Sequence, residues 1–304
     1  MKRQNTNVFL AALFLTAAIF ALPCARAAVH AEEKQGVEAS EGAQSLRADT
    51  SSGTIGARYA NEELVYQVGV LFFDDAATGT VSLKKGGDND YVATFTAHTV
   101  GVVDRIYHRQ DTYVAHLKEV DHGRRFVTKS FEKTIEVNGK VRKGVTSMDY
   151  AKNEMTWKSW GGGKDDRTGL VRLKDGMRYD DPLAAFYNFR YGVYGAIKEL
   201  QIYKIPTFPK EDHTPEIFLR VASKGEFDKK TNGLKPYADY LAEVKLDREL
   251  FGSGSGEIDI FFTEGLVPVE AVAKDVVFFG DVRGKLREIG ITMDMKKTAG
   301  MAGE

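Results

Sequence analysis

Apolar and polar residues alternate with a period of two over most of the chain after residue 61, and this pattern constrains the fold more than any other feature. Leu64, Tyr66 and Val68 begin the alternation, and the run from Tyr91 to Ala97 repeats it. A period of two is typical of β-strands that bury one face. Tight turns such as Asn138–Gly139, whose residue types favour a two-residue hairpin, join successive runs. The sequence therefore predicts a mainly β fold, a single antiparallel curled sheet or barrel-like domain.

One short segment, residues 181–190, departs from this pattern and predicts a helix. Asp180 or Asp181 can cap its N-terminus, and Pro182 suits the first helical position because its missing N–H costs nothing there. Helical spacing then places four side chains on one face: Leu183, Phe186, Tyr187 and Arg190. We expect this face to pack across an end or opening of the sheet.

The first 27 residues contain the three parts of a secretory signal peptide. The basic start Lys2–Arg3 is followed by the apolar run Val8–Leu22 and by the small-residue site Ala25–Ala27. We predict cleavage after Ala27 and a periplasmic location. No stable membrane span is expected afterwards, because the apolar run is shorter than the roughly 20 residues that a bilayer requires. The only cysteine, Cys24, lies in the removed segment, so the mature chain would hold no disulfide and no thiol ligand.

Composition divides the remaining chain and limits its partners. Residues 28–60 are rich in Ala, Glu, Gly, Ser and Thr without periodicity, which predicts a disordered leader. Residues 61–291 form the predicted β-rich domain, and residues 292–304 a flexible tail. The formal net charge of the whole chain is -1, and cleavage would remove basic residues but no acid. A mildly acidic chain without a basic block argues against nucleic acid as a partner.

The sequence contains no recognisable catalytic motif, and we assign no catalytic residue, cofactor or metal ligand from it. Gly252–Gly256 lacks the Lys-Ser/Thr and the following helix of a phosphate-binding loop, so a hairpin turn is the favoured interpretation. The histidines lack the spacings of metal sites. The neighbouring acids Asp165–Asp166 and Asp180–Asp181 lie in loop and helix-cap contexts that already explain them.

Three residues are candidates for ligand binding: Trp157, Trp160 and Arg190. The two tryptophans flank Ser159 beside Gly161–Gly163, so we expect at least one of them at a loop rim. There it could stack on a sugar or cover an apolar ligand, or it could instead cap the core. Arg190 ends the predicted helix, where it can contact a ligand or pair with the helix dipole or a buried carboxylate.

The predicted helix also carries a resemblance to a known family. Residues 181–190 match the pattern Asp-Pro-Leu-small-small-aromatic-Tyr-x-apolar-Arg, and the chain resembles the bacterial exported family called domain of unknown function 3108. The resemblance spans about residues 62–286, with weaker matches at residues 64–79 and 280–286. Residues 261–269 depart from the family, since they keep its Pro-Val without its Trp or Arg. The resemblance implies an exported, strand-rich, barrel-like envelope domain and assigns no activity.

These observations leave three classes of function open. The first is a non-catalytic module that binds or scaffolds an envelope component, lipid-like or saccharide, in or beside the curled sheet. The second is a hydrolase of envelope polymers, which would need two carboxylates about 5 to 9.5 Å apart in one cleft. The third is a subunit whose sheet edge, or whose long connection over residues 205–236, docks an envelope protein.

Overall fold

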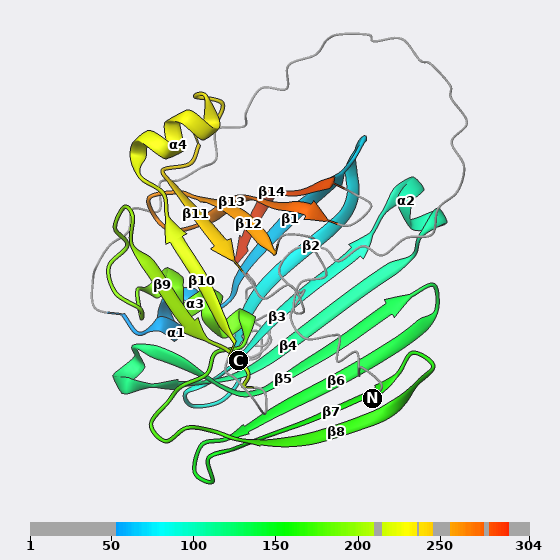
Figure 1. Ribbon diagram of the computed structural model, residues 1–304, viewed down its shortest axis with the longest axis vertical. Coiled ribbons are helices and arrows are strands. Elements are labelled where there is room, and N and C mark those ends of the chain that lie inside the picture. Colours follow the sequence, from blue (N-terminus) through cyan, green and yellow to red (C-terminus); the bar gives the residue numbers. More distant parts are fainter. Residues whose placement is uncertain (1–52, 210–214, 236, 246–255, 277–279, 292–304) are drawn as a thin grey trace, which may run out of the picture.

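The structure is a computed structural model that describes residues 53–209, 215–235, 237–245, 256–276 and 280–291. Within these residues fourteen strands form one continuous antiparallel sheet. The predicted fold class is therefore confirmed: a mainly β protein built on a single curled sheet (Figure 1).

The strands are β1 Glu62–Val70, β2 Phe73–Lys85, β3 Asp90–Thr99, β4 Arg109–Val120, β5 Arg125–Val137, β6 Lys140–Asp149, β7 Glu154–Gly161, β8 Lys164–Arg172, β9 Ile202–Pro206, β10 Glu216–Val221, β11 Tyr240–Lys245, β12 Glu257–Phe262, β13 Pro268–Val276 and β14 Gly280–Ile291. The helices are α1 Ile55–Tyr59, α2 Gly101–Ile106, α3 Pro182–Tyr191 and α4 Lys224–Thr231, with a short 3-10 turn η1 at Asp121–Gly123.

The sheet consists of two meanders joined where the first and last strands meet. Its order runs from β8 down to β1, then from β14 down to β9, so β1 pairs with β14. The edge strands β8 and β9 do not pair within the described residues, so the sheet is curled but not closed. Figure 1 shows the arm β1–β8 and the arm β9–β14 curving around α3, and the main core contains residues from all three.

The turns account for much of this order. Asn138 and Gly139 join β5 to β6 with φ values of 48° and 78°, which confirms the predicted two-residue hairpin. Gly161–Gly163, beside which the sequence analysis expected a loop rim, also have positive φ and turn the chain from β7 into β8. Asp165–Asp166 therefore lie in β8 and not in a loop. Of the predicted turn at Gly252–Gly256, only Gly256 lies within the described residues.

Helix α3 confirms the predicted helix but is buried more completely than expected. Asp181 is its N-cap, Pro182 its first residue and Gly192 its left-handed C-cap. The sequence pattern predicted one packed face, yet Ala184 and Asn188, which lie outside that face, are also buried. The reason is that the curled sheet surrounds the helix, which packs against β3, β4, β5 and α1.

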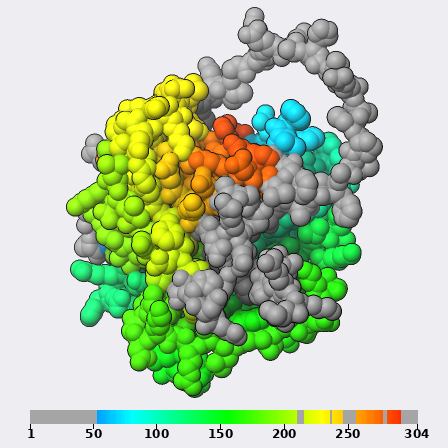
Figure 2. Space-filling model, in the orientation of Figure 1, coloured from blue at the N-terminus to red at the C-terminus, as the bar shows by residue number. Residues whose placement is uncertain are grey.

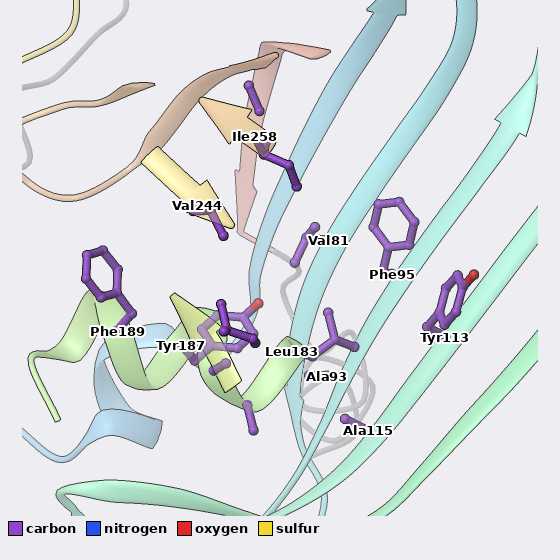
Figure 3. Close-up of a cluster of buried hydrophobic side chains, with 14 of the residues drawn as sticks. Val81, Ala93, Phe95, Tyr113, Ala115, Leu183, Tyr187, Phe189, Val244 and Ile258 are labelled. Atoms are coloured by element: carbon purple, nitrogen blue, oxygen red, sulfur yellow. The ribbon is translucent and has the colours of Figure 1, made fainter. Parts of the chain in front are cut away.

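The labelled side chains of the core show this enclosure directly. In Figure 3, Leu183 and Tyr187 of α3 face Val81 and Ala93 of the first arm, while Val244 of the second arm approaches from the other side. The two arms thus share one apolar core with the helix between them.

Three helices lie where the sequence analysis expected none. Residues 55–59 form α1, and Ile55 and Tyr59 are buried in the core, although the sequence analysis assigned these residues to the leader. The polar helix α4 lies in the segment expected to be irregular, and Ser223 with Glu226 forms a complete capping box at its start. Every helix in the described ranges is too short or too polar to traverse a bilayer.

The two ends of the sheet differ, and each is named after its helix. The α3 end holds the first residues of β1 and β5 and the last residues of β4, together with α1 and α3. The α2 end holds the last residues of β1 and β3, the first residues of β2 and β4, and α2.

Candidate functional site

A pocket lies on the concave face of the sheet, between the two arms and toward the α2 end. Its volume is about 30 Å³, enough for about two water-sized groups. Apolar side chains from three parts of the fold form most of its wall: Val81 and Phe95 from the first arm, Ile260 and Pro268 from the second, and Phe186 from α3. The pocket therefore marks where α3 stops filling the space inside the curled sheet.

Strand alternation and one glycine create this space. Tyr66, Gly79 and Ala97 face each other across β1, β2 and β3 and all point inward. A Cβ added at Gly79 would lie 3.7 Å from the Phe95 ring, an ordinary contact. A larger side chain at this position would therefore extend into the pocket rather than clash with the backbone.

A cluster of polar residues, all buried except the half-buried Arg142, continues from the pocket along the concave face. The residues Arg109, Asp111 and Tyr113 of β4, Lys133 of β5 and Arg142 of β6 form it, and they are called the cationic cluster below. Strand register places Asp111 opposite Ala97 of the pocket, and Tyr113 between Phe95 and Lys133. Cross-strand neighbours of this kind lie about 5 Å apart at Cβ, so the cationic cluster adjoins the pocket.

The cationic cluster combines close pairing with strong electrostatic perturbation. The Arg109 guanidinium donates to both carboxylate oxygens of Asp111, with Nε–Oδ1 and Nη2–Oδ2 distances of 3.0 and 2.9 Å. Burial raises the pKa of Asp111, although Arg109 opposes the shift. Burial and the nearby Arg142 lower the pKa of Lys133 to about 7. The Tyr113 hydroxyl is buried and has no hydrogen-bond partner in the structure, and burial raises its pKa.

The surface at the α2 end exposes several large apolar side chains. Leu71, Phe72 and Phe73 form the tip of the β1–β2 hairpin, where Phe72 is 95% exposed. Val102 and Ile106 of α2 are exposed as well, at 56% and 71%. α2 packs against β2, and Figure 2 shows the light blue hairpin tip and the teal α2 on the same edge of the molecule.

At the α3 end, hydrogen bonds and ion pairs hold the charged side chains in a network. Asp181 accepts hydrogen bonds from the backbone N–H groups of Leu183 and Ala184 and from the Thr128 hydroxyl, at 2.7, 3.0 and 2.6 Å. Burial raises the pKa of Asp181 to about 6, despite these bonds. Asn188 exchanges two hydrogen bonds with the backbone of Phe126 in β5, at 2.9 and 3.0 Å. These bonds tie the helix to the sheet.

The neighbouring Asp180 also forms hydrogen bonds only with groups of the fold. The Arg125 guanidinium donates to both of its oxygens at 3.0 Å, and Tyr194 and Asn188 also donate to it. Asp180 and Asp181 are fully buried, so this acidic pair lies in the helix attachment and not in a cleft.

The predicted site residue Arg190 lies in the same region and is 2% exposed. Its guanidinium forms a bidentate ion pair with Glu62, with Nη1–Oε2 and Nη2–Oε1 distances of 2.6 and 2.8 Å. Its Nε donates to the Leu266 carbonyl at 2.8 Å. Burial alone would lower the pKa of Arg190, but Glu62 holds it above its usual value. The structure therefore places Arg190 as a link between α3, β1 and the second arm.

The other two predicted site residues do not lie together. Trp157 is in the middle of β7 and points to the concave face, where it packs against the core. Its indole lies over Gly169 of β8, since a Cβ at that glycine would come within 2.4 Å of the ring. Trp160 is at the end of β7 on the opposite face, beside Lys158. Arg190 lies at the α3 end, so the structure does not join these three residues into one site.

Sequence reasoning missed the cationic cluster, although a signal for it exists. Arg109 and Asp111 have the same strand phase as the core residues Tyr113 and Ala115, and Lys133 has the phase of Phe131. Charged residues on the apolar phase of a strand face the core and mark a buried polar site. Within the described residues, no group of three or more His, Cys, Asp or Glu side chains lies close enough together to hold a metal ion.

The comparisons with known proteins add the following. No family model and no curated protein matches the chain, so the resemblance to domain of unknown function 3108 stays a prediction. A similar solved structure is the crystal structure of a beta-barrel-like protein of domain of unknown function DUF1849 from Brucella abortus. It is 14% identical, covers 76% of this chain and 97% of that chain, and has a TM-score of 0.43. This likeness is too distant to carry an argument about function.

The fold and the pocket define a class: an open, curled antiparallel sheet with a helix enclosed at one end and an apolar pocket toward the other.

Proposed function

We propose that this protein is an exported module of the cell envelope that binds an apolar, lipid-like component on the concave face of its sheet, with only an alkyl end of it in the pocket, and catalyses no reaction. The observation that supports the proposal is the apolar pocket bounded by both arms and by Phe186. Ligand sites in proteins are typically concave and mostly apolar, with a few polar groups nearby. The predicted signal peptide, residues 1–27, supports a periplasmic location.

The pocket chemistry favours a lipid-like component over a saccharide. A sugar needs several hydrogen-bonding groups and an open aromatic face. The one hydroxyl of the named pocket wall, on Tyr66, already donates to the Pro268 carbonyl at 2.9 Å. Trp157, the concave-face tryptophan, lies against Gly169 and the core. An alkyl group needs no such partners and gains free energy from burial alone.

Filling the pocket tests the proposal. The variant Gly79→Leu projects a side chain into the pocket, and Gly87→Leu is its control, because Gly87 is exposed and no atom lies within 4 Å of its added Cβ. We expect native mass spectrometry of protein from its own host to show a bound lipid-like species that Gly79→Leu loses and Gly87→Leu keeps. Bare protein in all three samples, with no response of the melting curve to envelope lipids, would sink the proposal.

The two alternatives gain less support from the structure. A hydrolase needs two acids flanking one cleft, whereas Asp180 and Asp181 serve the cap of α3 and its attachment to β5. Docking of a protein along β8 would use its outer edge, but that strand begins with the charged run Lys164–Arg167. Charged edge strands resist pairing with another chain. Cross-linking in periplasmic extract distinguishes this class from lipid binding.

A further inference from the structure

The exposed apolar side chains at the α2 end belong to two neighbouring elements. Leu71, Phe72 and Phe73 follow one another at the tip of the β1–β2 hairpin, and Val102 and Ile106 are exposed on α2. α2 packs against β2, and Figure 1 shows the hairpin tip and α2 beside each other. These five side chains are called the apolar patch below. Single exposed apolar residues are common, but several on one edge indicate contact with a protein or a membrane.

The turn at the hairpin tip uses residue types that its backbone does not favour. Leu71 and Phe72 alone connect β1 to β2, and Leu71 has a positive φ of 50°. Such turns favour Gly, Asn or Asp, because a larger side chain at positive φ crowds its own backbone. The β5–β6 turn, which is hydrogen-bonded to the segment after α2, follows this rule with Asn138–Gly139. The β1–β2 turn therefore holds two apolar side chains in water at a cost to its own backbone.

The charges beside the apolar patch indicate which surface it can contact. Asp74 and Asp75 follow the turn on β2 and are exposed. Arg105 of α2 is exposed, whereas the half-buried Asp104 pairs with His108. Anionic lipids attract clusters of Lys or Arg, and the described residues of the hairpin tip and α2 hold no such cluster. A surface without net charge is therefore the better match.

The size and shape of the apolar patch favour a bilayer over a second protein molecule. From their exposed fractions, the five side chains present roughly 600 Å² to solvent. A stable protein interface buries about 800 Å² on each partner, so the patch is small for one. Phe72 is 95% exposed at the apex of a turn, where a protein partner would need a matching pocket. A bilayer needs none, and membrane-binding segments insert Phe and Leu side chains at the boundary of headgroups and acyl chains.

We propose that the apolar patch inserts into the surface of a bilayer with zwitterionic headgroups and docks the α2 end of the protein on a membrane. Phe72 enters the acyl boundary, while Asp74 and Asp75 stay among the headgroups. The inference goes beyond the proposed function, because it concerns another surface and requires no component in the pocket. In the docked orientation the pocket, which lies toward the α2 end, is on the membrane side of the molecule.

Flotation with phosphatidylcholine vesicles tests the inference on protein purified from its own host. We expect the wild type to float with the vesicles equally well at low salt and at about 0.5 M salt, because salt screens charges and not apolar insertion. Phe72→Ser is expected to bind about tenfold more weakly, since burial of a phenylalanine side chain contributes at least this factor. Leu234→Ser is the matched control, because Leu234 is also largely exposed but lies next to α4, on the other side of the molecule in Figure 1.

A second variant distinguishes a membrane contact from a structural role. Leu71→Asn places a residue type that tolerates positive φ in the turn. It is expected to weaken vesicle binding severalfold without lowering the thermal midpoint. A lower midpoint would mean that Leu71 packs within the protein, and the inference would fall.

The pocket variant Gly79→Leu separates this inference from the proposed function. It leaves the apolar patch unchanged and is expected to float like the wild type. Phe72→Ser, in turn, is expected to keep the lipid-like species that native mass spectrometry detects. Each proposal can therefore fail while the other stands.

Three further outcomes would overturn the inference. The first is a wild type that does not float, or that floats no better than Phe72→Ser. The second is binding only to phosphatidylglycerol vesicles that high salt abolishes, which would indicate a contact between charges. The third is a wild-type dimer in sedimentation that Phe72→Ser converts to a monomer, which would assign the apolar patch to contact between two copies of the chain.

Discussion

The two ends of the curled sheet differ in how their buried charged groups are held. At the α3 end, Asp180, Asp181 and Arg190 each have close partners that belong to the fold. At the α2 end, burial lowers the pKa of Lys133 to about 7. Buried hydroxyls without a hydrogen-bond partner occur at both ends, so they do not distinguish the two. The α3 end is therefore an attachment that holds the helix in the sheet, whereas the α2 end contains a buried lysine whose charged form is costly to the fold.

A lysine whose pKa is strongly lowered by burial is typical of functional sites, because such sites are selected for binding and not for stability. The sequence analysis drew attention to the α3 end instead, because the recognisable helix and the candidate ligand-binding residue Arg190 lie there. In this fold the most recognisable segment is the structural one.

The largest effect is expected from the ion pair at the α3 end. Replacing Arg190 by Met leaves Glu62 without its guanidinium partner in a site where Glu62 is only 16% exposed. Breaking a buried pair in this way costs about 3 to 5 kcal/mol, measurable as a lower midpoint in urea. The double variant with Glu62→Gln is expected to recover part of that loss. A loss below about 1 kcal/mol, the value of a surface pair, would contradict the role given to this end.

Two substitutions in α3 compare a residue of the core with a residue of the pocket wall. Leu183 is 0% exposed and Phe186 is half-buried at the pocket. Leu183→Ala is expected to cost about 2 to 5 kcal/mol through lost contacts and a new cavity. Phe186→Ala is expected to lower the thermal midpoint by less, although it removes more atoms. Equal decreases of the thermal midpoint in calorimetry would show that Phe186 packs like a core residue and does not border the pocket.

The free energy of unfolding is expected to depend on pH through Lys133. The unfolded lysine holds its proton to near its usual pKa of 10.5, whereas the folded one releases it at about 7. Between these values the unfolded state binds more protons, so the free energy of unfolding contributed by this group rises as pH rises. Denaturation of Lys133→Met is expected to show a smaller rise than the wild type from pH 7 to 10. Parallel curves for the two proteins would mean that Lys133 is solvated like a surface lysine.

The fold class could be predicted from the sequence because the sequence signals for strands, turns and helix ends are local. The Asp181 cap with Pro182 and the Asn138–Gly139 turn each set their own backbone geometry within a few residues. Helix α4 was missed because its eight residues are mostly polar and a single aromatic, Phe227, anchors it. The capping box of Ser223 with Glu226 was the available signal for its start.

The site could not be derived in the same way, because it depends on strand register. Ala97, Asp111 and Ile135 belong to three strands and become neighbours only through pairing across β3, β4 and β5. The pocket further needs the second arm to fold back so that Ile260 and Pro268 meet the first arm. Such long-range placement is not contained in any single period or motif.

The smallest effect on the free energy of unfolding is expected at the tip of the β1–β2 hairpin. A substitution there tests the comparison of the two ends from the α2 end. Phe72 is 95% exposed, so Phe72→Ser removes almost no buried area and should change the free energy of unfolding by no more than about 0.5 kcal/mol. Phe126→Ser is the matched substitution at the α3 end, where Phe126 is 0% exposed, and it should cost at least several kcal/mol.

Urea denaturation of both variants gives the contrast directly. A clear loss in Phe72→Ser would mean that the tip packs within the protein, and the α2 end would then be as closed as the α3 end. An unchanged midpoint would mean that the exposed aromatic side chain adds nothing to the free energy of unfolding. Exposed apolar side chains of this kind are expected at the α2 end, which holds the pocket, and not at the α3 end.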